Sequence, residues 1–212
     1  MNLVLLGAPG AGKGFHAQLL SDKLKIPTIS TGELIRDRIK VGDNESKVLE
    51  KYVSDGALVP DELICNILQN RVKQSDCEKG FILDGFPRSL SQAKILDELC
   101  IDVDLAVEIV ISDDKIFERL LNRRVCSKCG ATFNLILKNS KVENVCDFCH
   151  GKLIQREDDN VSTIEQRLEV FRKQTGPVRD FYKSVDKYYK INGEMGSEYV
   201  QEKLFEIIGE FL

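Results

Sequence analysis

The stretch that most constrains the fold of this chain lies in its first fifteen residues. The apolar run MNLVLL (1–6) leads into GAPGAGKG (7–14), which has the pattern G-x-x-x-x-G-K, and a helix is expected over 13–24. In such a loop, glycines let backbone N–H groups converge on phosphate oxygens, and the N-terminus of the following helix attracts the same anion. Lys13 adds a mobile positive charge. The pattern predicts a phosphate-binding loop; a glycine-rich turn with an incidental lysine is the alternative.

Length and charge limit the classes of function. The 212 residues suffice for one hydrophobic core with a small appended lobe. The formal net charge of −4 argues against general nucleic-acid binding, so a phosphate site must be built from local cations. No apolar run is long enough to span a bilayer, and the N-terminus lacks the pattern of a signal peptide. Seven cysteines suit a reducing compartment, so we expect a cytoplasmic protein. From the net charge and the short apolar runs, we expect neither nucleic-acid nor membrane partners.

Short apolar runs alternate with helix-like segments along the chain. Strands are expected at 3–6, 28–29, 81–83, 105–110 and 188–191. Helices are expected at 13–24, 31–40, 46–54, 61–71, 89–99, 113–124, 163–185 and 198–211. This alternation predicts an α/β fold with a parallel sheet covered on both faces, and ligands in such folds gather beyond the carboxyl ends of the strands. The alternation stops over 126–155, where we expect an inserted lobe.

The insert carries two C-x-x-C pairs separated by sixteen residues: Cys126 with Cys129, and Cys146 with Cys149. This spacing is typical of a four-cysteine zinc site, in which two tight turns aim four sulfurs at one ion. A closed shell of four sulfurs indicates a structural metal. The alternatives are unligated or disulfide-bonded cysteines, and His150 offers a substitute ligand. A zinc ribbon can also bind nucleic acid.

A second group of residues suits phosphate chemistry. The apolar run 81–83 ends at Asp84, where phosphate-loop proteins keep an acidic residue that faces Mg²⁺, and Arg88 follows on the same rim. A rim ion pair between the two is the alternative. Further arginines flank the insert, together with two carboxylates that could hold a lobe shut: Arg119, Arg123, Arg124, Arg156, Arg167, Asp158 and Asp159. Such a lobe would close over phosphates and exclude water. Arg124 fits an ordinary solvated arginine equally well.

Taken together, these stretches resemble an adenylate kinase of the long-lid type with a zinc-bearing lid. The matching segments cover essentially the whole chain: GAPGAGKG (7–14), STGELIR (30–36), GALV (56–59), DGFPRSLSQ (84–92), RLLNRR (119–124), the cysteine pairs, and REDD (156–159) with Arg167. The resemblance implies a P-loop NTPase-type parallel β-sheet flanked by helices. It divides the chain into a core (1–29, 60–121 and 160–212), a mobile AMP-binding helical lobe (30–59) and a zinc-bearing lid (122–159).

The resemblance also implies an activity: reversible, Mg²⁺-assisted transfer of a phosphoryl group from ATP to AMP, giving two ADP, by a monomer. It implies catalytic roles for Lys13, Asp84, Arg88, Arg123, Arg156 and Arg167. The implied ATP site comprises Gly10, Ala11, Gly12, Lys13, Gly14, Phe15, Arg119, Arg123, Thr132, Phe133 and Met195. The implied AMP site comprises Thr31, Arg36, Ala57, Leu58, Val59, Gly85, Arg88, Gln92, Arg156 and Arg167. Asp158 and Asp159 would close the lid, and Cys126, Cys129, Cys146 and Cys149 would hold structural Zn²⁺.

Within that resemblance, Gln92 would read the adenine edge, because a mismatched base leaves buried polar groups unpaired. Arg36 and Arg88 would take the AMP phosphate. Asp84 would orient Mg²⁺ through water.

One position departs from the family pattern. The family usually reads G-K-G-T-Q at this loop, whereas this chain has Phe15 and His16 after Gly14. The loss of the threonine hydroxyl predicts ATP binding weakened by roughly 1–3 kcal/mol, since a hydrogen bond to a charged group is lost. His16 would add positive charge if protonated. Because of Phe15, a catalytically impaired nucleotide-binding protein is one alternative to an active adenylate kinase. Two further alternatives are a kinase for another nucleoside monophosphate and a nucleic-acid-binding zinc ribbon. Thr31 and Gln92 favour AMP.

Overall fold

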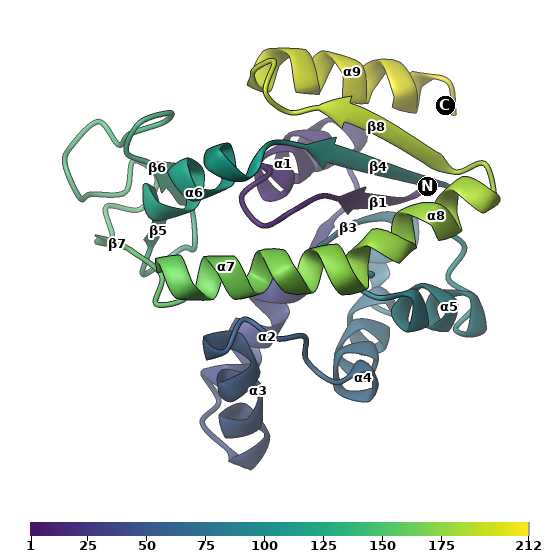
Figure 1. Cartoon of the computed structure of the whole chain (residues 1–212), viewed down its shortest axis with the longest axis horizontal. Helices are drawn as coiled ribbons and strands as arrows, with labels where there is room; N and C mark the ends of the chain where they lie inside the picture. The colour runs from purple at the N-terminus through teal and green to yellow at the C-terminus, as the bar shows by residue number, and fades with distance from the viewer. Residues whose placement is uncertain (212) are drawn as a thin grey trace.

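A five-stranded parallel sheet forms the centre of the computed structural model, which describes residues 1–211 (Figure 1). The strand order is β2-β3-β1-β4-β8. The strands are β1 (Asn2–Leu6), β2 (Thr28–Ser30), β3 (Phe81–Asp84), β4 (Leu105–Val110) and β8 (Tyr188–Asn192). Each neighbouring pair is parallel. The α/β class and the five strands expected from the sequence are confirmed.

Helices cover both faces of this sheet because its strands are apolar on both sides. Leu3 and Leu5 of β1 pack with α1 (Lys13–Leu24), α6 (Asp113–Leu121), α7 (Val161–Val170) and α9 (Ser197–Gly209). Val4 and Leu6 belong to the core of the opposite face, which includes residues of α2 (Thr31–Ile39), α3 (Asn44–Ser54), α4 (Asp61–Val72), α5 (Leu90–Glu98) and α8 (Gly176–Ser184). Figure 1 shows α2 and α3 projecting away from the sheet as a separate lobe. Among residues 1–211, no helix combines the length and the apolar character needed to cross a membrane.

The topology fixes where the site must lie. Strand β1 stands between β3 on one side and β4 on the other, which is a switch point of the strand order. In the register, Leu5 pairs with Asp84, and Asp84 pairs with Ser30. The glycine-rich loop, the end of β3 and the start of α2 therefore meet at one carboxyl edge.

The insert forms a small antiparallel sheet, visible at the left of Figure 1, with the order β6-β5-β7. Its strands are β5 (Arg123–Cys126), β6 (Thr132–Asn134) and β7 (Leu153–Ile154). The expected helix over 113–124 was therefore too long, since α6 ends at Leu121. Side-chain amides of Asn122 and Asn134 donate to the carbonyls of Glu118 and Arg119, which satisfies the end of the helix.

The single helix expected over 163–185 is wrong in its middle. Helix α7 and helix α8 are separated by a π-helical turn, η2 (Phe171–Thr175). Pro177 lies just after this turn and lacks the N–H that a continuous α-helix would use to bond the fourth preceding carbonyl. A short 3₁₀ turn, η1 (Ser75–Cys77), was not expected. The remaining helices agree with the sequence analysis within two residues at each end.

Candidate active site

The glycine-rich loop joins β1 to α1 at the carboxyl edge of the sheet. Gly10 and Gly12 have φ values of 81° and 99°, in the left-handed region that residues with a Cβ rarely adopt. A loop of this kind, placed before a helix N-terminus, presents backbone N–H groups to an anion. The ammonium of Lys13 donates to the carbonyls of Gly7 (2.8 Å) and Ala8 (2.9 Å), so its charge lies over the loop.

Phe15 and His16 occupy the first turns of α1 and differ in burial. Phe15 is 43% exposed, and the Lys138 ammonium from the insert lies 5.3 Å from the centroid of its ring. His16 is buried, and burial together with the charge of Arg119 lowers its pKa to about 4. His16 is therefore neutral near pH 7 and adds no positive charge to the loop.

Asp84 ends β3 directly beside the loop. Its Oδ2 lies 3.2 Å from the position that a Cβ on Gly14 would take, so a side chain at position 14 would crowd the carboxylate. This contact is a reason for glycine where the general motif has Ser or Thr. The carbonyl of the next residue, Gly85, accepts from Arg88 Nε (2.6 Å) and Thr31 Oγ1 (2.9 Å). Hydrogen bonds to this one carbonyl therefore link the segments that follow the carboxyl ends of β2 and β3.

A cavity, here called the lobe pocket, lies between the β3 rim and the helical lobe. Apolar side chains, among them Ile35, Val53 and Ile64, line it together with arginines, a combination that suits a base and a phosphate. Of the residues implied at the AMP site, all except Arg156 line this pocket: Thr31, Arg36, Ala57, Leu58, Val59, Gly85, Arg88, Gln92 and Arg167. The structure brings together residues that lie more than a hundred positions apart in the sequence.

A second cavity, here called the loop pocket, borders the glycine-rich loop. Its lining includes Gly7, Pro9 and Lys13 from the loop side. Both cavities share the same central residues: Gly56, Leu58, Gly85, Arg88 and Arg167. They are therefore two adjoining parts of one cleft, joined at two shared arginines.

Positive charge is crowded in this cleft. Burial, with smaller contributions from neighbouring arginines, lowers the pKa of Lys13 to about 8, of Arg88 to about 10 and of Arg156 to about 9. Burial also lowers the pKa values of Arg36 and Arg167. A bound anion would relieve both the repulsion and the loss of solvation. An anionic ligand is thus favoured by local charge in a chain whose net charge is −4.

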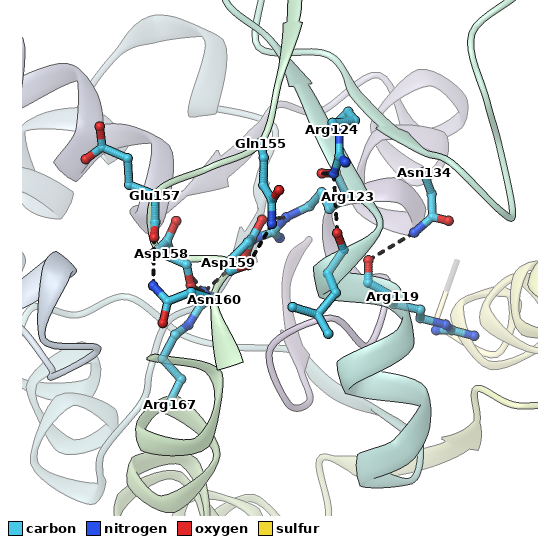
Figure 2. A network of polar contacts seen from close by, with 11 residues as sticks. Arg119, Arg123, Arg124, Asn134, Gln155, Glu157, Asp158, Asp159, Asn160 and Arg167 are labelled. Atoms are coloured by element: carbon cyan, nitrogen blue, oxygen red, sulfur yellow. Dashed lines mark hydrogen bonds and ion pairs between the residues drawn. The ribbon is translucent and has the colours of Figure 1, made fainter. Parts of the chain in front are cut away.

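Two carboxylates hold the arginines at the edge of the insert (Figure 2). Asp159 is buried and accepts two hydrogen bonds from Arg123, at 2.7 Å from Nε and 2.5 Å from Nη2. Asp158 pairs with Arg167 Nη1 at 2.9 Å. Asn160, which follows, accepts from the backbone N–H of Thr163 and so begins α7. These pairs connect β5 of the insert to α7 of the central domain.

The residues implied beside the ATP base are less closely grouped. Arg119 donates to the carbonyls of Ala11 (3.2 Å) and Gly193 (3.1 Å), so it bridges the glycine-rich loop and the loop after β8. Phe133 is only 2% exposed and packs in the core of the insert, so its ring is unavailable to a nucleotide and its backbone alone can face one. Of all the residues implied at the ATP site, only Lys13 lines the loop pocket. Four of the others are exposed: Gly14, Phe15, Thr132 and Met195.

The four insert cysteines converge on one point. All four sulfurs lie within 4.8 Å of one another, with 3.3 Å between Cys126 and Cys149 and 3.7 Å between Cys129 and Cys146. Tetrahedral zinc with bonds of about 2.3 Å separates its sulfurs by about 3.8 Å, whereas a disulfide bond is about 2.05 Å long. A Cβ on Gly151 would lie 2.8 Å from the Cys126 sulfur, so glycine is needed there. The geometry favours the metal set over disulfides.

Two contributors were missed in the sequence analysis. Thr175, in the π-turn η2, is buried, lines the loop pocket and donates from its hydroxyl to the carbonyl of Arg88 (2.8 Å). Asp61, the first residue of α4, accepts from the side-chain amide of Gln92 (2.8 Å). The only local signals were Pro177, which marks a disturbed helix, and an acidic residue at a helix start. Neither signal reveals a tertiary partner.

Comparisons with known proteins agree with this site. The family model described as "Adenylate kinase" matches residues 5–187. The adenylate kinase of Acetivibrio thermocellus is 46% identical over 200 residues, which cover 92% of each chain. That of Caldicellulosiruptor bescii is 44% identical over 100% of this chain and 97% of the relative, and that of Archaeoglobus fulgidus is 41% identical over 98% of each. The resemblance inferred from the motifs is thereby confirmed, and this chain belongs to the adenylate kinase family.

Proposed function

We propose that this chain transfers the terminal phosphoryl group of ATP to AMP, reversibly, and releases two ADP. The observation that carries the proposal is the pair of pockets that share Arg88 and Arg167. The loop pocket suits the phosphates of ATP, because it borders the glycine-rich loop and Lys13. The lobe pocket suits AMP. Membership of the adenylate kinase family supports the same assignment.

The chemistry asks for alignment and charge neutralisation rather than for a protein nucleophile. An oxygen of the AMP phosphate attacks the terminal phosphorus of ATP, a new P–O bond forms, and the bond to the oxygen that leaves with ADP breaks. Lys13, Arg88 and Arg167 line the cleft where this transfer would occur. Arg123 and Arg156 complete the positive surround from the insert.

Substrate binding is divided between the two halves of the cleft. For AMP, Arg36 and Arg88 take the phosphate, Thr31, Gln92 and the backbone of 57–59 hold the base side, and Gly85 contributes backbone. For ATP, the backbone of 10–15 holds phosphates and Arg119 stacks on the base. Contacts with the remainder of ATP come from Arg123, Met195 and the segment 132–133.

Closure of the cleft would involve movement of three parts of the chain relative to one another. The core comprises 1–29, 60–121 and 160–212, the AMP-binding lobe is 30–59, and the lid is 122–159. Lid closure excludes water that would otherwise hydrolyse ATP. The pairs that Asp158 and Asp159 form with Arg167 support this role, because they connect the insert to α7.

Mg²⁺ fits the rim of β3. The Asp84 carboxylate lies against Gly14 of the phosphate-binding loop, and a hard oxygen ligand next to phosphates suits this ion. When bound, Mg²⁺ would neutralise part of the phosphate charge, and Asp84 would hold the ion through water.

Zn²⁺ fits the four sulfurs of the insert and would have a structural role there. We expect chelation, or Cys146→Ser, to lower the melting temperature of the full chain by at least about 5 °C, because metal binding contributes folding free energy. Cys100→Ser is the matched control, since Cys100 is exposed and lies outside the insert. A melting temperature that does not respond to chelation would refute ligation by these cysteines.

ADP formation from ATP, AMP and Mg²⁺ tests the proposed function directly. Arg123→Gln should lower kcat by at least about a hundredfold, since it removes one of the cations proposed to stabilise the charge on the transferring phosphoryl group. Arg124→Gln is the matched control. Arg124 is the next residue in the chain, and its side chain donates to the local carbonyls of Leu121 and Arg123 instead of to a carboxylate. Wild-type protein that forms no ADP, or equal losses in both variants, would contradict the proposal.

A catalytically impaired nucleotide-binding protein is the second candidate, favoured by Phe15 alone. Its mark would be wild-type protein that binds ATP without turnover and gains turnover with Phe15→Thr. We further propose a cytoplasmic monomer. Seven cysteines without a disulfide bond suit a reducing compartment, and one chain supplies the lining of both pockets.

A further inference from the structure

The side-chain amide of Gln92 is held from both ends. Its Oε1 accepts from the backbone N–H of Arg88 at 2.8 Å, and its Nε2 donates to Asp61 Oδ1 at 2.8 Å. The residue is 2% exposed, yet it lines the lobe pocket. Asp61 lies behind it, at the start of α4, and its other oxygen accepts from the hydroxyl of Ser91. The amide is therefore held by a backbone N–H of Arg88 and by a carboxylate that does not line the pocket.

These two partners permit only one orientation of the amide. A backbone N–H can only donate, and a carboxylate can only accept. A rotation of 180° about the last side-chain bond would set the NH₂ group against the N–H of Arg88 and the oxygen against Asp61. Both hydrogen bonds would be replaced by repulsive contacts in a buried place, where unpaired polar groups are costly.

The fixed orientation leaves one lone pair on Oε1 and one proton on Nε2, since an amide oxygen accepts two hydrogen bonds and an NH₂ group donates two. An adenine base offers the matching pair: an exocyclic 6-amino donor beside a ring-nitrogen acceptor. A 6-oxopurine offers the reverse, a carbonyl acceptor beside an N–H donor. Only a flipped amide could pair with it.

We propose that Asp61 is a specificity-determining positioning residue that locks Gln92 in the adenine-reading orientation and so excludes 6-oxopurine monophosphates. The inference rests on the proposed function, because it takes the lobe pocket as the site of the acceptor nucleotide. Asp61 does not line that pocket, so it acts on the base through Gln92.

Inosine monophosphate is the sharpest probe. It has the same ring size, sugar and phosphate as AMP and differs in the polarity of the edge that Gln92 would read. With ATP as donor, we expect Asp61→Asn to lower the ratio of kcat/KM for AMP to kcat/KM for inosine monophosphate by at least about tenfold. Asparagine keeps the shape of Asp61 but can donate or accept, so either amide orientation of Gln92 is then satisfied.

Glu62→Gln is the matched control, because it removes the same charge from the same first turn of α4 at an exposed position. It should leave the ratio unchanged. Asp61→Ala is a second variant should the asparagine variant fold poorly, and it should lower the ratio too, since it removes the acceptor.

The two failures can be told apart. No ADP from ATP and AMP in the wild type would contradict the proposed function. Wild-type turnover of AMP with the ratio unchanged in Asp61→Asn and Asp61→Ala would overturn the lock alone. A loss of both activities in equal proportion, with a lowered melting temperature, would also overturn it, since a merely structural role moves both substrates together.

Discussion

At the scale of single residues, Phe15 stands where the family resemblance leads us to expect threonine. Its ring is partly exposed at the N-terminus of α1, the end that would face the phosphates of ATP. We expect Phe15→Thr to strengthen ATP binding by about 1–3 kcal/mol, because the new hydroxyl can donate to a charged phosphate. Calorimetric titration of ATP measures this.

Phe15→Leu separates the hydroxyl from the loss of the aromatic ring. It also removes the ring beneath the Lys138 ammonium without adding a donor. An equal gain in both variants would show that the ring obstructs ATP, and no gain with threonine would contradict the prediction.

Lys13 predicts a pH dependence at the same scale. Burial lowers its pKa from 10.5 to about 8. Between these values the unfolded chain holds a proton that the folded chain has lost, so the contribution of Lys13 to the free energy of unfolding rises with pH across that window. ATP binding has the opposite sense: its affinity should fall above about pH 8, because binding requires the charged ammonium.

ATP binding near pH 8.5 should therefore take up a proton, which calorimetry in buffers of different ionisation enthalpy detects. Lys13→Met should abolish the uptake. A wild-type binding enthalpy that is independent of the buffer would disprove the shift.

At the scale of elements, the π-turn η2 joins the helix that carries Arg167 to the backbone that carries Arg88. Thr175→Val keeps the shape of the side chain and removes the hydrogen bond to the Arg88 carbonyl, worth about 0.5–1.5 kcal/mol. We expect KM for AMP to rise by about two- to tenfold. Thr175→Ser should restore the wild-type value, and a failure of serine to do so would assign the effect to packing.

Elements also show how far the sequence can be interpreted. The glycine-rich loop, the strands and the cationic residues of the cleft were predictable, because each has a local pattern or a place in a known order. The C-terminal end of α6 and the break after α7 were not. Their causes are tertiary: amides of Asn122 and Asn134 end one helix, and Pro177 with the hydroxyl of Thr175 shapes the other. The support of Gln92 by Asp61 has no local signal.

At the scale of the whole molecule, the cleft is a concentration of positive charge inside a protein of net charge −4. We expect ATP and AMP, each at about one hundred times its Kd, to stabilise the fold by about 2.7 kcal/mol apiece. The melting temperature should rise by about 5–10 °C for each. Adenosine at the same concentration as AMP is the control, since it has the base and sugar without phosphate, and equal stabilisation by adenosine at that concentration would contradict an electrostatic origin.

The buried Asp159 accepts two hydrogen bonds from Arg123 and so gives this arginine an internal substitute for a phosphate. In the proposed reaction, an incoming phosphate would compete with this carboxylate for Arg123, and the carboxylate would be available to the arginine again when product departs. Such an exchange keeps the change in solvation small in both directions, so strong attraction for the substrate need not trap the product. The acidic pair would thus set the rate of release as well as the position of the lid.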